Sequence, residues 1–326
     1  MAVLAVAALT AAGCGSSPAS TGSSHTTAQG SCASSSNAKS KLIVVITPSP
    51  SNVFFKFEQV YAAQEAQADG YQTLVLNNND DPTTQYNEVG TAIARHAAAI
   101  ILDNAGAQAS ISAVAKAKAA CIPSFLIDRE INQTGVAVAQ IVSNNFQGAT
   151  LGGQEFAQLM DYQGQYAELL GLPTDTNSAT RSQGFLSVTQ QYPKMKLVAQ
   201  QAANWDQTTA YNDVQTILQA HPGIKGIIAL NDTMAQGAWA ALQQAHKANV
   251  IVIGMDGSPY VVSSILAGGI RATVMQPVEQ FTALAVQEAV RYLKTGSTGQ
   301  PEKQLINCIL ITKSNAASAH NFSYAS

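Results

Sequence analysis

Short apolar runs alternate with longer stretches of helical character along most of this chain, and that alternation constrains its fold more than any other feature. The runs at residues 42–46, 99–102 and 122–127 have the length and composition of buried strands. Between them, Asp81-Pro82 provides an N-cap and a first-turn proline for a helix that extends to about His96. Because repeated strand–helix units build sheets covered by helices, we predict an α/β fold with doubly wound parallel sheets.

The alternation begins again after a linking strand near residues 136–142, which indicates two similar lobes rather than one large sheet. The expected strands are residues 42–46, 71–76, 99–102, 122–127, 136–142, 165–170, 195–200, 224–230, 250–253 and 270–275. The expected helices lie around residues 54–61 and at 82–96, 108–119, 147–160, 179–191, 207–220 and 278–294. The last helix carries apolar residues on one face, so we expect it to pack back on the first lobe.

Each predicted lobe consists of two segments of the chain. The N-terminal lobe comprises residues 41–143 plus 277–303, the C-terminal lobe comprises residues 144–276 plus 304–315, and residues 316–326 form a C-terminal tail. The chain is expected to cross between the lobes near Ser143, at Gln276 before Pro277, and about Lys303. These crossings define a three-segment hinge.

The first forty residues have a composition that cannot build a core. Residues 1–13 are a short apolar run that ends at Gly13-Cys14, which resembles a bacterial lipoprotein signal with lipidation of Cys14. Residues 14–40 are rich in Ser, Thr, Gly and Ala and are expected to be a disordered tether. The resemblance implies export and a lipid anchor on the outer face of the cytoplasmic membrane, or a periplasmic location. After Leu9 no stretch is long enough for a transmembrane helix.

Composition and motif content argue against several classes of protein. The formal charge of −3 and 11% charged residues include no basic stripe, so no nucleic-acid partner is expected. The five His residues are scattered, and there is no G-x-S-x-G, Walker loop or G-x-G-x-x-G, so we expect no enzyme activity, no metal and no cofactor. Apart from Cys14, an odd set of cysteines indicates one disulfide and one free thiol, with Cys121 paired to Cys32 or to Cys308.

Polar residues stand at the tips of three of the predicted strands. Asp128-Arg129 and Asn231-Asp232 follow an apolar run directly, and Asp256 ends the segment Gly254-Met255-Asp256 that follows a third run at 251–253. Ligands of open α/β sheets bind outside the carboxyl ends of the strands, so these tips predict a binding site. Because Asn231-Asp232 is also a helix-start signal, we assign Asn231 to the ligand and Asp232 to capping.

A set of short motifs occurs along the chain in the order typical of one family. They are Asn-Val-Phe-Phe at 52–55, Ile-Asp-Arg at 127–129, Arg-Ser-Gln-Gly-Phe at 181–185, Ala-His-Pro at 220–222, Leu-Asn-Asp-Thr-Met-Ala at 230–235, Val-Ile-Gly-Met-Asp-Gly-Ser-Pro at 252–259 and Ala-Thr-Val-Met-Gln at 272–276. Together they resemble the ribose-binding type of periplasmic sugar-binding protein, the capture subunit of ABC importers. The likeness covers nearly all of residues 41–313 and implies the type I periplasmic-binding fold.

The resemblance also implies a set of ligand contacts. Aromatic side chains suit the C–H faces of a sugar, and charged or amide groups suit its hydroxyls. The implied contacts are Asn52, Phe54, Phe55, Asn104, Asp128, Arg129, Arg181, Trp205, Asn231, Asp256 and Gln276, with Ser143 and Leu172 added more weakly and Met255 standing where the family has an aromatic.

The implied ligand is a small neutral polyhydroxy molecule held between closing lobes. A pentose and a short polyol such as xylitol, erythritol or threitol both remain open, with the polyol favoured because residues 102–107 and 125–130 resemble the sugar-alcohol branch. The implied partner is an ABC permease, and the protein is expected to be a monomer. Presentation of the bound sugar to a membrane receptor remains an alternative. A lactose-repressor type regulator needs a helix-turn-helix, which residues 16–40 cannot supply.

Overall fold

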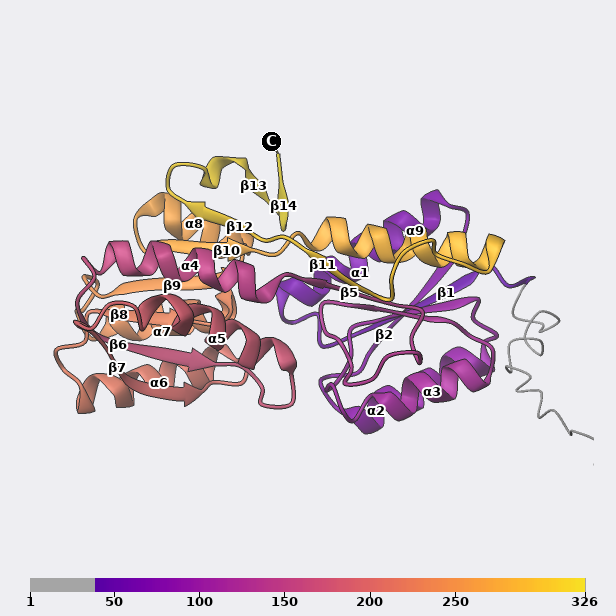
Figure 1. Ribbon diagram of the computed structural model, residues 1–326, viewed down its shortest axis with the longest axis horizontal. Coiled ribbons are helices and arrows are strands. Elements are labelled where there is room, and N and C mark those ends of the chain that lie inside the picture. Colours follow the sequence, from indigo (N-terminus) through magenta and orange to yellow (C-terminus); the bar gives the residue numbers. More distant parts are fainter. Residues whose placement is uncertain (1–38, 326) are drawn as a thin grey trace, which may run out of the picture. The chain divides into compact units, whose positions relative to one another are not determined.

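Two six-stranded sheets, each flanked by helices, form the body of the protein (Figure 1). The computed structural model describes residues 39–325, which belong to one compact unit. The predicted signal segment 1–13, Cys14, Cys32 and most of the predicted tether 14–40 lie outside the described residues. Within residues 39–325, no helix has both the length and the apolar character needed to cross a membrane.

The first sheet has the strand order β11-β5-β4-β3-β1-β2, and all its neighbouring strands are parallel. Its strands are β1 (Leu42–Thr47), β2 (Gln72–Asn77), β3 (Ala99–Leu102), β4 (Ser124–Ile127), β5 (Ala139–Ser143) and β11 (Lys303–Ile306). The helices of this half are α1 (Val53–Ala68), α2 (Pro82–Ala94), α3 (Ile111–Ala119) and α9 (Val278–Thr295). We call this sheet with its helices the first half.

The second sheet has the order β12-β10-β9-β8-β6-β7 and is parallel except where β12 pairs with β10. Its strands are β6 (Gly164–Leu170), β7 (Met195–Ala202), β8 (Gly226–Ala229), β9 (Ile251–Asp256), β10 (Ala272–Met275) and β12 (Ile309–Thr312). Its helices are α4 (Asn145–Leu159), α5 (Thr176–Thr189), α6 (Gln207–Ala220), α7 (Asp232–Gln244) and α8 (Pro259–Ala267). This is the second half, and the predicted α/β class with doubly wound parallel sheets is confirmed.

Strand periodicity explains why the first sheet is covered on both faces. Ile43 and Val45 of β1 belong to one apolar cluster with residues of α1 and α9, whereas Val44 and Ile46 belong to a second cluster with residues of α2 and α3. Successive side chains of a strand point to opposite faces, so a continuous apolar run needs a cover on each face. The expectation that the last long helix packs on the first half is confirmed by its place in the first cluster.

Side-chain caps fix where the helices begin. Asp81 accepts a hydrogen bond from the backbone N–H of Thr84, as its Asp-Pro sequence predicted. Helix α3 begins at Ile111 rather than at residue 108, and Ser110, its N-cap, makes no side-chain capping bond. The other boundaries differ from the predicted ones by a few residues, which is the usual uncertainty at fraying ends.

The chain crosses between the halves at three places. It leaves β5 for α4 after Ser143, leaves β10 for α9 at Gln276-Pro277, and leaves β11 for β12 at residues 307–308. The third crossing was expected about Lys303, but β11 pairs with β5 from Lys303 to Ile306. Residues 304–306 therefore lie in the first half, not with the second as predicted.

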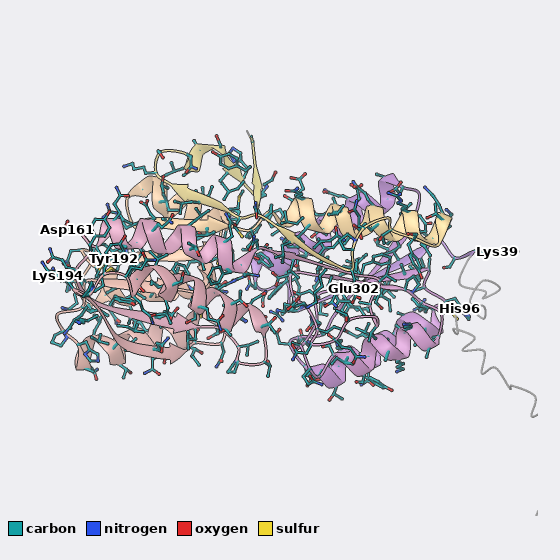
Figure 2. The ribbon with its side chains drawn as sticks, viewed as in Figure 1. Lys39, His96, Asp161, Tyr192, Lys194 and Glu302 are labelled. Atoms are coloured by element: carbon teal, nitrogen blue, oxygen red, sulfur yellow. The ribbon has the colours of Figure 1, made fainter. Side chains whose placement is uncertain are left out.

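Side-chain views show that the two sheets present their carboxyl ends to each other. Lys39 and His96, which precede β1 and β3, lie at one end of the described part, and Asp161 and Lys194, which precede β6 and β7, lie at the other (Figure 2). The strands of both halves, except the antiparallel β12, thus run toward the middle. Polar residues at the strand tips are brought together there.

One of the two predicted disulfide pairings of Cys121 is wrong. Cys121 is half of a disulfide, and Cys308 is a free, buried thiol. Cys308 lies in a small apolar cluster of the second half with Met255 and Val274, whereas Cys121 follows α3 in the first half. Pairing of Cys121 with Cys308 is therefore excluded.

The C-terminal segment belongs to both cores rather than forming a separate tail. It contains a short 3₁₀ helix, η3 (Ala316–Ser318), and two short strands, β13 (Ala319–His320) and β14 (Ser323–Tyr324). Ala316 and Ala319 are buried in the core of the second half, whereas Phe322 is buried in the core of the first. The Phe322 ring lies 5.4 Å from that of Phe54 and 5.5 Å from that of Phe57.

We expect Phe322→Ala to lower the free energy of unfolding by about 3–5 kcal/mol, because it empties a fully buried aromatic site. Urea denaturation measures this loss. Tyr260→Ala is the matched control, since Tyr260 is 62% exposed and its loss should change stability by less than about 0.5 kcal/mol. Equal effects of the two substitutions would mean that the C-terminal segment does not contribute to the core.

Candidate functional site

A buried pocket lies where the carboxyl ends of the two sheets meet. Its walls come from both halves and consist of Asn52, Phe54, Phe55, Asp128, Arg129, Asp175, Asn177, Arg181, Trp205, Asn231, Asp256 and Gln276. The space between these side chains is about 20 Å³, which holds about one water molecule. The halves are thus closed upon each other in this structure.

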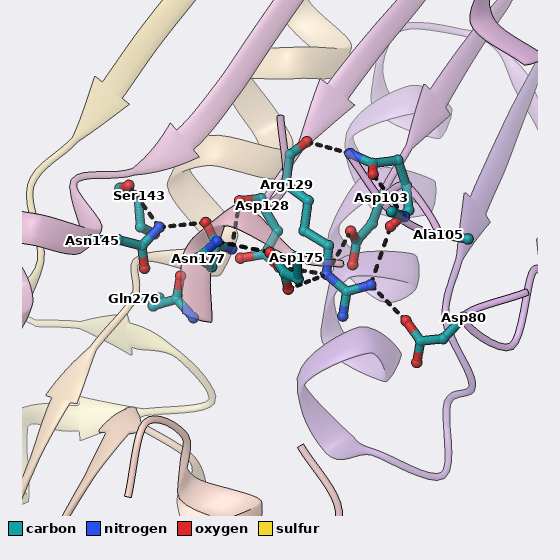
Figure 3. Close-up of polar contacts among 12 residues, drawn as sticks. Asp80, Asp103, Ala105, Asp128, Arg129, Ser143, Asn145, Asp175, Asn177 and Gln276 are labelled. Carbon is teal, nitrogen blue, oxygen red and sulfur yellow. Dashed lines mark hydrogen bonds and ion pairs between the residues drawn. The ribbon is translucent and has the colours of Figure 1, made fainter. Parts of the chain in front are cut away.

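Arg129 organises the side of the pocket that belongs to the first half. Its guanidinium lies 2.6 Å from a carboxylate oxygen of Asp80, 3.0 Å from Asp175, 3.5 Å from Asp103 and 3.7 Å from Asp128 (Figure 3). Full burial opposes its charge, but these surrounding carboxylates raise its pKa well above the ordinary value. A permanently charged donor is therefore held at the pocket wall.

Some of these contacts join the two halves directly. Asp175 is the N-cap of α5 in the second half, so its ion pair with Arg129 crosses between them. Asn177 donates from its side-chain amide to the backbone carbonyl of Asp128 at 3.1 Å, and Asn145 donates to Asn177 at 2.9 Å. Asp175 and Asn177 were not predicted as site residues, although an Asp before a helix is a recognisable cap signal.

The aromatic side chains have unequal roles. Phe55 lies under Arg129, whose guanidinium carbon is 5.2 Å from the ring centre. Phe54 is 3% exposed and contacts Phe281 and Phe322 as well as lining the pocket. Phe54 is thus part of the core and of the wall at once. Asn52 is the N-cap of α1, and its side chain accepts a hydrogen bond from the Phe54 N–H. This bond fixes the start of the helix whose first turn carries Phe54 and Phe55.

Arg181 organises the opposite side, which belongs to the second half. Its Nε donates to Asn145 at 2.7 Å and its Nη1 donates to the carbonyl of Leu230 at 2.8 Å. Nη1 also lies 3.5 Å from Asp256, and the guanidinium carbon is 5.3 Å from the Trp205 ring. These bonds fix the orientation of the guanidinium, so it can present its remaining donors without first being ordered.

Several pocket residues adopt strained backbone conformations. Asp128 has φ of 57°, Trp205 has φ of 64°, and Asp256 has φ of 143°. Such conformations cost about 1–3 kcal/mol for non-glycine residues and cluster at functional sites. At Asp128 and Asp256 the backbone turns where a strand ends, which aims each carboxylate toward the pocket rather than along the sheet.

Burial changes the acidity of the pocket carboxyls. It raises the pKa of Asp256 to about 8, although Arg181 and the amide donor of Gln276 oppose the increase. It raises the pKa of Asp128 to about 6 against the lowering effects of Arg129 and Arg181. A ligand hydroxyl that donates to either carboxylate would favour the charged form and reverse part of this effect.

Some buried polar atoms at the pocket have no hydrogen-bond partner within the described residues. Apart from Arg129 Nε, which has ion-pair contacts, these are Asp128 Oδ1, Gln276 Oε1 and Trp205 Nε1, two acceptors and a donor. Buried polar groups are nearly always paired, so unpaired ones mark places where a ligand can bond. Both kinds of bond suit a hydroxyl group, which donates and accepts.

Most of the predicted contact residues line this pocket, but four do not. The side-chain amide of Asn104 donates to the Arg129 carbonyl at 2.8 Å and accepts from the Gly106 N–H at 3.0 Å, so it shapes a loop. Met255 is buried in the Cys308 cluster, Leu172 packs against the core of the second half, and Ser143 ends β5 at the first crossing. These four are therefore not retained as proposed contacts.

The assignment of Asp232 to helix capping is wrong. The side chain of Asn231 accepts from the Met234 N–H at 2.8 Å, so Asn231 is the N-cap of α7 and lines the pocket as well. Asp232 instead accepts from the Ser258 N–H and from the Thr273 hydroxyl, both at 2.6 Å. It joins neighbouring loops and strands beneath the site.

Two other places in the described residues have some features of a binding site. A depression of about 390 Å³ in the second half is lined by residues of α4, α8, the end of β12 and neighbouring loops, including Glu155, Arg271 and Lys313. It is larger, but none of its lining residues has an unpaired buried polar atom. Glu58, Asp103 and Asp128 are near enough to one another to hold a metal ion. Arg129, 3.5 Å from Asp103, opposes a second cation there.

Comparison with known proteins places this geometry in a family. The model of the periplasmic binding protein domain matches residues 43–298. The D-apiose import binding protein of Paraburkholderia graminis is 58% identical over 86% of this chain and 90% of its own length. The ribose import binding protein of Salmonella typhimurium is 31% identical over 80% of this chain and 88% of its own. A solute-binding protein of an ABC transporter from Actinobacillus succinogenes, solved with D-allose, superposes with a TM-score of 0.80 at 28% identity, covering 85% and 99% of the two chains.

Gly171 is required because Trp205 lies directly against it. A Cβ atom at position 171 would overlap the six-membered ring of Trp205. We expect Gly171→Ala to displace the indole, to cost about 1–3 kcal/mol of stability through overpacking, and to weaken ligand binding. Gly223→Ala is the control, since no atom of residues 39–325 outside its own neighbours lies within 4 Å of its Cβ position. If calorimetric titration finds the same ligand affinity in Gly171→Ala and Gly223→Ala, Trp205 does not contribute to the binding site.

Proposed function

Because the chain belongs to the periplasmic binding protein domain family, we propose that it is the substrate-binding protein of a sugar ABC importer, with a monosaccharide held between its two halves. The observation that carries this proposal is the set of unpaired, buried polar atoms at Asp128, Trp205 and Gln276, beside aromatic faces. Such a wall matches a molecule with apolar C–H faces and many hydroxyls.

The proposed ligand is a pentose of the D-apiose kind. The 58% identical relative is named for D-apiose import, and a relative at 31% identity is named for ribose import. Both sugars are pentoses. Charged groups of both signs line the pocket, and Arg129 and Arg181 are each already paired with carboxylates, which favours a neutral ligand. A pentose thus replaces the short sugar alcohol as the first candidate, and sugar alcohols remain comparison compounds in the ligand screen.

Capture requires the halves to part and close again. A space of about 20 Å³ admits no sugar, so opening must precede binding. Opening would break the Arg129–Asp175 ion pair and the bond from Asn177 to the Asp128 carbonyl, while the three crossings act as the hinge. Closure over the ligand would reform these contacts and add bonds from both halves to its hydroxyls.

The proposed location and partners follow from the same function. The protein would be exported and act outside the cytoplasmic membrane as a monomer, anchored by a lipid on Cys14. Its closed form would be recognised by an ABC permease. Delivery of the closed form to a membrane receptor uses the same binding chemistry and remains the alternative role.

A thermal-shift screen of the full chain tests the ligand class. D-apiose, ribose, allose, xylitol, erythritol and threitol should be compared at equal concentrations. A ligand at 100 times its Kd adds about 2.7 kcal/mol to the free energy of unfolding by mass action. We expect D-apiose to give the largest increase in melting temperature. The absence of a shift with every polyhydroxy compound would refute sugar binding.

Small-angle scattering tests capture by closure. D-apiose should reduce the radius of gyration of the wild type, and Arg181→Ala or Asp256→Ala should abolish that reduction because each removes a charged wall of the second half. Arg271→Ala is the control, since Arg271 is exposed and lies away from the pocket. Unchanged compaction in Arg181→Ala and Asp256→Ala would contradict the assignment.

A further inference from the structure

A cluster of fully buried carboxyl groups lies directly behind the pocket. Glu58 projects from α1 and Asp103 follows β3, and both are 0% exposed. Oxygen atoms of Glu58, Asp103 and Asp128 lie within 4.8 Å of one another. Neither Glu58 nor Asp103 lines the pocket, so direct ligand contact does not explain why they are there.

If every carboxyl group of this cluster were ionised, several buried oxygens would have no hydrogen-bond donor. Both oxygens of Glu58 and both oxygens of Asp103 lack a donor within the described residues. An ionised carboxylate can only accept, whereas a protonated carboxyl donates one hydrogen bond. A buried charge without donors is costly, so a proton on the pair is the simplest arrangement that satisfies it.

The charges around Glu58 also favour its protonated form. The charged groups that face it are Asp103, Asp128 and Arg129. Burial is the largest cause that raises the pKa of Glu58, followed by the charges of Asp103 and Asp128, and only Arg129 among these groups lowers it. Asp103 in turn faces Arg129, Asp128, Asp80 and Asp175. One guanidinium therefore serves several carboxyls, which leaves too little positive charge to ionise them all.

We propose that Glu58 and Asp103 share one buried proton and that this acid pair positions Arg129 at the pocket wall. The Glu58 hydroxyl donates to the Asp103 carboxylate. Asp103 itself stays ionised, and its carboxylate lies 3.5 Å from Arg129 Nε. Glu58 is a positioning residue that acts on the ligand through Asp103 and Arg129. Only the effect on sugar affinity rests on the proposed function, because the shared proton is a property of the ligand-free protein.

The direction of the pH effect follows from linkage. A carboxyl that keeps its proton in the folded protein contributes stability that is fully present below its unfolded pKa and is lost as pH rises through the folded pKa. Ionisation of the pair at alkaline pH also adds a negative charge beside Asp128 and Asp80, all competing for Arg129. Through this pair, sugar affinity should fall as pH rises, whereas ionisation of Asp256, whose pKa burial raises to about 8, favours bonds from ligand hydroxyls and acts in the opposite direction.

Carbon NMR of the ligand-free full chain with labelled Glu carboxyls tests the shared proton. We expect one carboxyl signal, absent from Glu58→Gln, to remain in its protonated position at neutral pH. In Asp103→Asn an amide donor faces Glu58, so the same signal should shift to its ionised position. A Glu58 signal that titrates near about 4.3, the ordinary Glu value, in the wild type would overturn the proposal.

The pH profile of D-apiose affinity tests the consequence for binding. Relative to Glu58→Gln, which keeps the contribution of Asp256, the wild type should lose affinity above neutral pH by up to about tenfold per pH unit for one proton. Glu168→Gln is the control, because Glu168 is buried in β6 and bonded to Ser182 and Gln200 away from the pocket. It should keep the wild-type slope. Equal slopes in the wild type and Glu58→Gln would overturn the positioning role.

Two outcomes separate this proposal from its rivals. If the NMR result stands but no sugar binds at any pH, the acid pair is upheld and the proposed function fails. Addition of Ca²⁺ or Mg²⁺ to the full chain should leave the melting temperature unchanged. A metal-dependent rise that is lost in both Glu58→Gln and Asp103→Asn would overturn the shared proton in favour of a bound cation.

Discussion

The closed arrangement depends on the ion pairs of the buried Arg129 guanidinium. It sits among carboxylates of the first half and also pairs with Asp175, which comes from the second half. A charge in this position cannot remain unpaired, because the free-energy cost of a lone buried ion is several kcal/mol. Asp80 already pairs with Arg129 within the first half, and closure adds the Asp175 carboxylate of the second half at 3.0 Å. Arg181 has a similar role opposite, held by Asn145 and Leu230 within its own half.

Parallel topology explains why these groups meet at all. In both sheets the strand tips carry polar residues, and most of the helices that follow, though not α3 and α9, begin with side-chain caps. Asn52, Asp175 and Asn231 are such caps and also line the pocket. The same residues thus satisfy helix termini and form binding surface. This double use ties the positions of the pocket walls to the most regular features of the fold.

Much of this could be predicted from local patterns. Strand length, cap signals and the polar residue after each apolar run depend on neighbours in sequence, and they identified Asp128, Asn231 and Asp256 correctly as tip residues. The lobe crossings were also located, except that β11 continues past Lys303 because its partner β5 is distant in sequence. An error of this kind is expected wherever a boundary is decided by pairing rather than by propensity.

Features that depend on distant contacts were missed or misassigned. Nothing near Glu58 in sequence indicates that Asp103 and Asp128 face it, and nothing near Phe322 indicates Phe54. Asn104 has a side chain that suits a ligand contact, but its amide already donates to the Arg129 carbonyl and accepts from the Gly106 N–H. Asn231 takes the capping role expected of Asp232 and lines the pocket as well, whereas Asp232 bonds to Ser258 and Thr273, which lie next to it only after folding.

A crystal structure of the full chain with D-apiose would show where the sugar binds. We expect the sugar between the two halves, with hydroxyls bonded to Asp128 Oδ1, Gln276 Oε1 and Trp205 Nε1 and with groups of both halves in contact. Sugar bound elsewhere, for example in the larger depression near Arg271, or sugar bound to one half alone, would contradict this expectation.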